Sequence, residues 1–452
     1  MPRRSVHLVP TGRADLDRRT EAALARFGLR LAAADEARAE AVVSLLPNRV
    51  ATDLARRHEL PLLVLAVDAP AGPRTLSLPA IAAAGRSVAV SLLAVMPSDG
   101  AARRLRTGAV KSSGLSPYLT LRRILETCAD WPARVLGRDR ATTAGPALGQ
   151  PHASAAADWL ALPLQVARNA VGRVREALTE EIWAVGIAPR SIASFLTRPA
   201  LDDVAWLPER SGGGFLADPF GLVDATGPVI LAEAFDPRLG RGEIVALRPE
   251  SPEPLPVTTG LAGHLSYPCL VEDEGVLYCV PENSASGRVT LLRVVRLPER
   301  FEPAAVLLDG FAGVDSTPFR HDGRWWMLAM DHADQDVTKL FLFHADRLLG
   351  PWQPHAGNPV RCDVRSARPA GPPFVHDGRL YRPAQDCSER YGGAVVLLRI
   401  DVLTPERFEE IPVARIEPDP AGPYPDGVHT LTPLGPAHTL VDGKRTRLKV
   451  GR

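Results

Sequence analysis

Two stretches of the sequence, PFRHDGRWWMLAMD at residues 318–331 and PFVHDGRLYRPAQD at residues 373–386, follow nearly the same pattern. In each, an Asp-Gly pair separates two runs that are rich in apolar residues. Asp-Gly in this setting is a strong signal for a β-hairpin, because glycine tolerates the positive φ that a tight turn requires. The same form appears upstream in SYPCLVEDEGVLYCVPEN at 266–283 and in ADPFGLVDATGPVILAEAF at 217–235. The chain therefore contains four related hairpins.

The hairpins recur at a regular interval. Their leading prolines stand at positions 219, 268, 318 and 373, which gives spacings of 49, 50 and 55 residues. A period near 50 residues with several short strands in each unit is typical of a β-propeller. A weaker fifth copy begins near residue 424, and EEIWAVGIAP at 180–189 is predicted to supply the strand that closes the ring. We therefore predict a five-bladed all-β propeller over residues 181–440, in preference to a β-solenoid, because the units are long.

The first 135 residues have a different pattern. Short apolar runs such as AEAVVSLLP at 39–47 and PLLVLAV at 61–67 alternate with segments of helical spacing such as ATDLARRH at 51–58. Strands that alternate with helices are typical of a layered α/β domain. We predict a multidomain protein with a small Rossmann-like α/β domain over 1–135, a linker and helical connector over 136–180, the propeller, and a C-terminal tail over 441–452.

The overall composition excludes several classes of function. The net charge of +1 offers no field for nucleic acid or an anionic membrane surface, and no apolar run approaches the roughly 18 residues that a membrane span needs. The five cysteines are odd in number and form no Cys-x-x-Cys pair, which predicts free thiols in a reducing, cytoplasmic compartment. We predict a small-molecule or glycan partner, no metal and no cofactor, and the sequence leaves the oligomeric state open.

The repeat also predicts which polar residues meet in space. In a propeller, the start of the first strand of each blade lies on the same face as the end of the second strand. First-strand starts carry Asp218, Asp315 and Arg368, with further polar residues at His264, Ser266, Tyr267 and His429. Second-strand ends carry four acids, which are Glu233, Glu282, Asp331 and Asp386. These acids either face a central pocket or accept hydrogen bonds from the backbone of the next blade, and the sequence leaves both interpretations open.

Paired carboxylates across a pocket are what cleavage of a glycosidic bond requires. One group must protonate the leaving oxygen, and the other must activate water or stabilise positive charge at the sugar carbon. Asp218 and Asp315 come from non-adjacent blades, which suits a separation across a central funnel.

The motifs FLADPF, HLSYP, VPEN, VDSTPF, LLGPWQPH, ARPAG, LYRPAQDC and YGGAVVL resemble, in this order, the N-terminal domain of glucosamine inositolphosphorylceramide transferases and its bacterial relatives. That domain is similar to the five-bladed propeller of arabinanase- and xylosidase-type glycosidases. The resemblance implies that Asp218 acts as a base and that Asp315 tunes its pKa and orientation. It also implies a glutamic acid on the fourth blade as the general acid, but this chain has Arg368 there. No glycosyltransferase domain follows the propeller in this sequence.

The missing acid leaves three candidates, Glu282, Asp386 and Glu233. Arg368, with Arg382 and Gln385 on the following strand, predicts either an anionic or phosphorylated sugar as substrate or a counter-ion for the acids. We predict catalytic roles for Asp218, Asp315, Glu282 and Asp386, and substrate-binding roles for Glu233, His264, Ser266, Tyr267, Arg368, Arg382, Gln385 and His429.

The first domain resembles formyltransferase-type α/β domains in its strand order and in GRSVAVSLLAVMPSDGAARRLRTGAV at 85–110. SLLPNR at 44–49 echoes a formyltransferase signature without the histidine that precedes it, and the Asn, His and Asp constellation of formyl transfer is not recognisable. We interpret it as a degenerate relative. The leading prediction is a glycosidase-like enzyme that hydrolyses or transfers a glycosyl unit. The alternatives are a non-catalytic carbohydrate-binding protein and a formyl or acyl transferase that uses the first domain.

Overall fold

The computed structural model describes residues 5–26, 29–33, 36, 39–46, 48–113, 116–137, 147–148, 151–153, 156–210, 214–333 and 338–449. The chain forms two compact units that divide between Arg175 and Glu176. Among the described residues, no helix is both long and apolar enough to cross a membrane.

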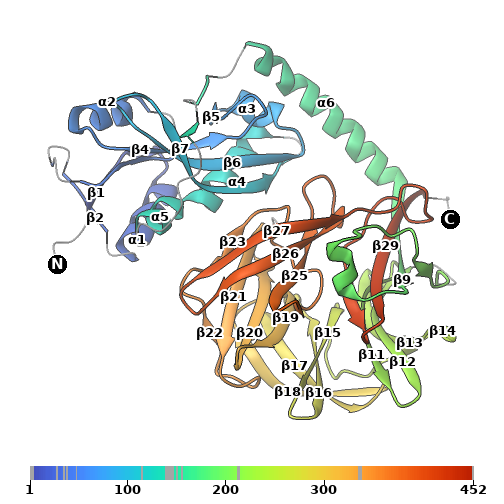
Figure 1. The fold of residues 1–452 in the computed structure, drawn as a ribbon. Helices are drawn as coiled ribbons and strands as arrows, with labels where there is room; N and C mark the ends of the chain where they lie inside the picture. Colours follow the sequence, from blue (N-terminus) through green and yellow to red (C-terminus); the bar gives the residue numbers. More distant parts are fainter. Residues whose placement is uncertain are drawn as a thin grey trace. The chain divides into compact units, whose positions relative to one another are not determined.

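The first unit is built on a mixed sheet with the strand order β2-β1-β3-β4-β6-β7-β8 (Figure 1). Strands β1 to β4 run parallel, and β6, β7 and β8 are each antiparallel to their neighbours. The strands are β1 Ser5–Leu8, β2 Arg30–Leu31, β3 Val42–Ser44, β4 Leu62–Val67, β5 Arg74–Thr75, β6 Ser87–Val95, β7 Ala102–Lys111 and β8 Ala147–Leu148, and the helices are α1 Ala14–Arg26, α2 Arg49–His58, α3 Leu78–Ala83, α4 Pro117–Cys128, α5 Trp131–Gly137 and α6 Ala156–Leu178. The predicted mixture of strands and helices is confirmed, whereas the formyltransferase likeness stays a prediction.

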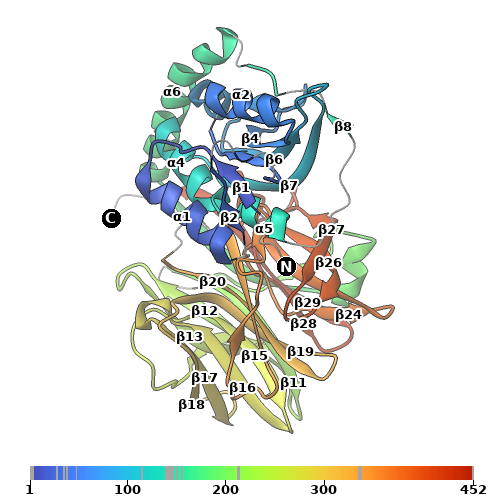
Figure 2. The same cartoon turned by 90° about the vertical axis from the view of Figure 1, so that its left-hand side faces the viewer.

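The second unit is a five-bladed β-propeller, as the repeat predicts. Figure 2 shows one blade, β15 to β18, as a single twisted sheet of four strands. The first four blades are β11 Phe215–Asp224, β12 Gly227–Asp236, β13 Arg241–Arg248 and β14 Ser251–Pro256; β15 Ser266–Asp273, β16 Val276–Glu282, β17 Arg288–Arg296 and β18 Arg300–Asp309; β19 Gly313–His321, β20 Arg324–Asp331, β21 Lys339–Ala345 and β22 Gln353–Pro354, with β23 Arg361–Cys362 beside β21; and β24 Phe374–His376, β25 Arg379–Asp386, β26 Ala394–Leu403 and β27 Phe408–Ile416.

The fifth blade closes the ring with strands from both ends of the propeller. It consists of β28 Leu431–Leu434, β29 His438–Leu448, β9 Thr179–Ala188 and β10 Ala205–Trp206. Strand β9 pairs with β29 along its whole length, from Thr179 opposite Leu448 to Ala188 opposite Thr439, and the two lie side by side in Figure 1. The closing role predicted for 180–189 is confirmed. The predicted tail from 441 is wrong over its first eight residues, because they complete β29 and bond to β9.

Three blades share a β-bulge at the pocket end of their first strand. The register shifts between Ala217 and Phe220, between Ser266 and Cys269, and between Val314 and Thr317. Each bulge contains one residue with positive φ, which is Asp218 (51°), Tyr267 (45°) or Asp315 (48°). A bulge bends the strand and redirects a side chain that would otherwise alternate with its neighbours. The repeat therefore places one specially directed side chain in each of these three blades.

Candidate active site

The propeller contains a pocket of about 210 Å³ at the bulged ends of its first strands. Carboxylates, two histidines and four aromatic side chains surround it. The lining residues are Trp183, Phe215, Ala217, Asp218, Glu233, Phe235, His264, Ser266, Glu282, Arg368, Tyr391 and His429. Seven of the twelve residues predicted for the site therefore meet in one cavity, namely Asp218, Glu233, His264, Ser266, Glu282, Arg368 and His429.

Asp218 lies in the first bulge, and its carboxylate is held by two neighbours from the fifth blade. The Thr430 hydroxyl donates to its Oδ1 at 3.0 Å, and His429 Nε2 lies 3.4 Å from the same oxygen. Burial raises the pKa of Asp218 to about 6, and the nearby His429 opposes that rise. Asp218 is therefore a buried carboxyl group that gains and loses its proton slightly below neutral pH.

Asp315 lies beneath the pocket, and its carboxylate is already occupied. Arg368 donates to it from Nε at 2.6 Å and from Nη2 at 3.3 Å, and Gln385 Nε2 donates at 3.1 Å. The Arg368 guanidinium also lies over the Tyr391 ring, 4.9 Å from its centroid. Burial raises the pKa of Asp315 to about 6 although Arg368 opposes this. The sequence left open whether Arg368 is a counter-ion for Asp386 or Glu282, and the structure pairs it with Asp315 instead. Asp315 itself does not line the cavity.

Second-strand acids support the bulge of the following blade. Glu282 Oε2 accepts the backbone N–H of Asp315 at 3.4 Å, and Asp442 Oδ2 on β29 accepts that of Asp218 at 3.1 Å. Both acids lie on the second strand of the preceding blade, Glu282 as the last residue of β16 and Asp442 in the interior of β29. For Glu282, the interpretation as an acceptor for the next blade is therefore confirmed, although its side chain also lines the pocket.

Glu233 occupies the corresponding position of the first blade but does not have this role. In the described part of the chain, no hydrogen bond joins its carboxyl group to Tyr267 or to any other donor. His264 Nε2 is 3.7 Å away, which is beyond hydrogen-bond distance, and burial lowers the pKa of His264. Glu233 is 7% exposed, and burial, together with Asp218 and Glu282, raises its pKa well above the ordinary value. Glu233 is thus a buried carboxyl group that favours its protonated form and faces the pocket without a partner.

The propeller region matches a known family. Residues 196–420 fit the family model described as Glucosamine inositolphosphorylceramide transferase 1, N-terminal. The match covers most of the propeller and slightly less than half of the chain. Among curated proteins, the Arabidopsis thaliana glucosamine inositolphosphorylceramide transferase 1 is 33% identical over 227 residues, which is 48% of this chain and 30% of the relative. Its Oryza sativa subsp. japonica counterpart is 31% identical over 246 residues, which is 52% of this chain and 33% of the relative. The chain thus spans about a third of the length of these relatives.

Solved structures resemble the propeller at low sequence identity. The RS223 β-xylosidase aligns with a TM-score of 0.37 and 13% identity, over 46% of this chain and 80% of its own. The α-L-arabinofuranosidase PaAbf62A from Podospora anserina, in complex with cellotriose, aligns with a TM-score of 0.37 and 12% identity, over 51% of this chain and 81% of its own.

In this propeller, aromatic rings form the walls of the pocket. Phe215 stacks on Phe235 with centroids 4.9 Å apart, and Trp183 stacks on His429 at 4.0 Å. The sequence analysis missed these aromatic residues, Tyr391 and Asp442. Trp183 stands in β9, the strand predicted to close the ring, and its pairing with the last strand of the fifth blade was the signal that could have identified it.

Other predicted site residues lie outside the pocket. Asp386 forms an ion pair with Arg415, and Arg382 is fully buried and donates to Glu410 from Nε at 2.6 Å. Asp386 follows Gln385 directly, so its side chain points to the opposite face of the sheet. The roles assigned to Asp386 and Arg382 in the pocket are therefore corrected. Gln385 and Tyr267 lie behind the lining, where Gln385 contacts Asp315 and the Tyr267 hydroxyl is 3.0 Å from Thr317 Oγ1.

Asp218, His429 and Asp442 bring three possible metal-binding atoms within 4.8 Å of one another. Each nitrogen of the His429 ring already faces a carboxylate: Nδ1 lies 2.5 Å from Asp442 Oδ2, and Nε2 faces Asp218. The Nδ1 contact is an ion pair without hydrogen-bond geometry, because Nδ1 finds no hydrogen-bond partner among the described residues. The three residues therefore form a compact charged group, which is held together by backbone N–H groups that donate to Asp442.

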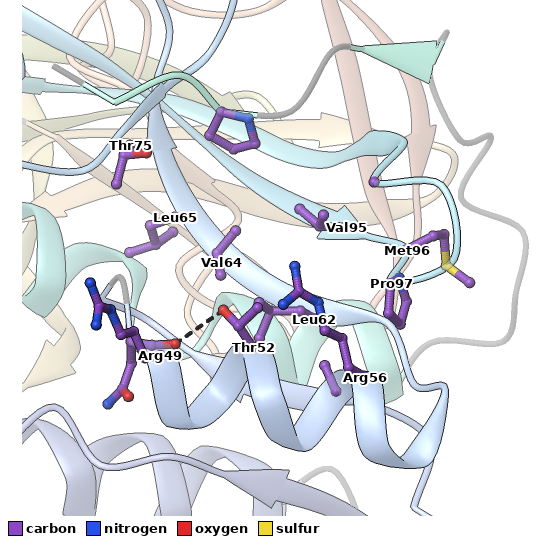
Figure 3. A pocket seen from close by; sticks show the side chains of 14 residues that line it. Arg49, Thr52, Arg56, Leu62, Val64, Leu65, Thr75, Val95, Met96 and Pro97 are labelled. Atoms are coloured by element: carbon purple, nitrogen blue, oxygen red, sulfur yellow. Dashed lines mark hydrogen bonds between the residues drawn. The ribbon is translucent and has the colours of Figure 1, made fainter. Parts of the chain in front are cut away.

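The first unit contains a separate pocket of about 390 Å³ between α2 and the sheet (Figure 3). Its walls are apolar strand residues such as Val64 and Val95, and its rim carries Arg49 and Arg56 from α2. Neither guanidinium group has a carboxylate partner among the described residues. The described lining residues include no histidine, cysteine or acid, and the predicted formyl or acyl transfer stays a prediction.

Proposed function

We propose that the propeller is a glycoside-processing domain. In this domain, Asp218 acts as the ionised carboxylate that activates water or stabilises positive charge, and Glu233 acts as the proton donor. One observation carries this proposal: two carboxyl groups of the same pocket are in unequal environments. Asp218 has a pKa of about 6 beside His429, whereas burial and neighbouring acids raise the pKa of Glu233 well above its ordinary range. Carboxyl groups whose pKa values differ in this way are suited to opposite roles in acid–base catalysis.

The chemistry follows from the two protonation states. Near neutral pH, Asp218 is ionised and can activate water or stabilise positive charge at the sugar carbon. The raised pKa of Glu233 favours its protonated form, and a glycosidic oxygen in the pocket would receive this proton. The aromatic walls offer apolar faces for a sugar ring. Hydrolysis and transfer both begin with these steps, and they differ in whether water or another hydroxyl completes the reaction.

This proposal moves the role of the missing fourth-blade acid to Glu233 on the first blade. Asp315 then keeps a supporting role, because Arg368 and Gln385 already engage its carboxylate. The names of the matched relatives describe a transferase acting with glucosamine and inositolphosphorylceramide. Because the match covers the propeller, these names support a carbohydrate as the ligand of this domain.

Aryl glycosides with different leaving groups test the proposal. A poor leaving group needs protonation and a good one does not, so Glu233→Gln should lose about 10²–10⁴-fold of turnover on the former and little on the latter. Asp218→Asn should lose turnover on both. Glu272→Gln makes the same chemical substitution at an exposed position of β15 and serves as the control. Equal losses on both substrates in Glu233→Gln would contradict the role of Glu233 as acid.

A second candidate function is carbohydrate recognition without turnover. Arg368 favours this function, because it stands where the resemblance implies a fourth-blade glutamic acid as the general acid. Arg368 also neutralises Asp315 through two hydrogen bonds. Under this alternative, glycosides bind the pocket, and Asp218→Asn and Glu233→Gln change their affinity while no product forms. Calorimetric binding together with product analysis separates the two functions.

A further inference from the structure

Asp442 is the centre of the hydrogen bonds that join the fifth blade to the first. Its side chain is completely buried on β29. Oδ1 accepts the backbone N–H groups of His429 and Thr430, each at 2.9 Å, and Oδ2 accepts that of Asp218 at 3.1 Å. The Asp442 carboxylate therefore fixes the backbone at Asp218 and at the neighbouring residues of the fifth blade. Asp218 has a left-handed φ of 51°, which needs such support.

His429 connects Asp442 to the side chain of Asp218. Its Nδ1 lies 2.5 Å from Asp442 Oδ2, and its Nε2 lies 3.4 Å from Asp218 Oδ1. The ring is only 2% exposed and stacks on Trp183, with the edge of Tyr391 5.4 Å away. An imidazole fixed between two carboxylates can be charged in a buried place where an isolated histidine would be neutral.

We infer that Asp442 is a positioning residue that acts through His429 to hold Asp218 as a carboxylate directed into the pocket. The inference rests on the proposed role of Asp218. The positive charge of His429 faces Asp218, and Asp442 keeps that charge in place. Without Asp442, the buried imidazole would give up its proton, and Asp218 would then retain its own proton to a higher pH.

The pKa directions agree with this geometry. Burial acts to lower the pKa of His429, but Asp442 and Asp218 outweigh burial and raise it. Burial acts to raise the pKa of Asp442, but His429 and the two backbone N–H groups hold it below the ordinary value. The other titratable or charged groups that act on the three residues are Asp315, Arg368, Glu233, His264 and Tyr391.

Imidazole ¹⁵N titration of the full chain tests the inference without any sugar. In wild type, His429 should remain doubly protonated to a pH above the ordinary histidine range. In Asp442→Asn, this proton should be lost at a lower pH, and His429→Gln identifies the signal. Thr430→Val is the matched control, because it removes a donor to Asp218 but keeps the backbone N–H that Asp442 accepts. An unchanged His429 titration in Asp442→Asn would overturn the inference.

A purely structural role for Asp442 would lower the melting temperature and leave the imidazole titration where it was. If Asp442→Asn does not fold, Asp218→Asn gives the same measurement from the other side of the ring, and the His429 proton should again be lost at lower pH. No change in this variant would also overturn the inference. Absence of any glycoside binding or turnover, with the titrations as expected, would contradict the proposed function alone.

Discussion

Arg368 holds the carboxylate of Asp315 across two blades through hydrogen bonds of 2.6 Å from Nε and 3.3 Å from Nη2. The two side chains are 14% and 1% exposed, so water screens the pair little. Removal of one partner from a buried ion pair leaves an uncompensated charge, which typically costs about 3–5 kcal/mol. We expect Asp315→Asn and Arg368→Met each to destabilise the propeller by this order.

The double variant Asp315→Asn/Arg368→Met should be less destabilised than the sum of the two single variants, because neither charge then remains unpaired. Urea unfolding of the four proteins measures this coupling. Additive effects would show that Arg368 and Asp315 do not stabilise each other.

The same pair predicts how the pocket responds to charge on the ligand. Because Asp315 engages the guanidinium fork of Arg368, a phosphorylated sugar should gain no affinity over its neutral counterpart. Arg368→Met should weaken both ligands to a similar degree. Titration calorimetry with both sugars measures this, and a selective loss of the phosphorylated ligand would restore the anionic substrate as the better hypothesis.

Asp218→Asn should lower the activity of the protein and raise its stability near neutral pH. Since the folded-state pKa of Asp218 is about 6 against an ordinary 3.8, the folded protein binds its proton more tightly than the unfolded chain. The free energy of unfolding therefore falls as pH rises from about 4 to 6, by at most about 3 kcal/mol from this group. At pH 7.5, Asp218→Asn should melt at a higher temperature than wild type, and the difference should shrink at pH 4. Melting curves of both proteins at both pH values test this expectation. A lower melting temperature for Asp218→Asn than for wild type at pH 7.5 would contradict a free-energy cost of burying the ionised Asp218.

Turnover should follow a bell-shaped dependence on pH. The acidic limb reports ionisation of Asp218, near pH 6, and the basic limb reports loss of the proton from Glu233. Glu282 is one of the acids that raise the pKa of Glu233. Glu282→Gln should therefore move the basic limb to lower pH, and a basic limb that does not move would exclude Glu233 as its source.

Gly242 lies directly behind Glu233. A Cβ atom at this position would collide with the Glu233 carboxyl group, which must then move. Gly242→Ala should therefore reproduce the leaving-group dependence of Glu233→Gln while the carboxyl group itself is kept. Kinetics on the same two aryl glycosides test this expectation, and wild-type behaviour on the poor leaving group would show that the position of Glu233 is unimportant.

The sequence predicted the blades well because each carries its own local signal. Asp322 and Asp377 stand in the Asp-Gly turns with φ of 47° and 48°, so glycine and aspartate at these sites set the hairpins without long-range help. Asp218 and Asp315 were identified for the same reason, since they open strands whose position the repeat defines.

The second-strand acids were harder to place. Counting from the leading proline of each hairpin makes the four second-strand acids look equivalent. However, Pro219 and Pro268 lie within the β-bulge of their strand, whereas Pro318 lies beyond its bulge and pairs with β20. Asp331 is therefore shifted by one residue from the position that Glu233 and Glu282 share, and a shift of one residue places a side chain on the opposite face of a strand. Asp442 and Trp183 were missed for another reason, since they reach the pocket only through pairing across more than 200 residues, which no local pattern records.

The pairing of β9 with β29 has a consequence for how the domain is made. Trp183 leaves the ribosome early, whereas Asp442 emerges only after four blades have been synthesised. The acceptor for the backbone N–H of Asp218 is therefore synthesised only after the blades that lie between them in the sequence. The strand that closes the ring completes the pocket, so a nascent propeller has this pocket only when all five blades are present.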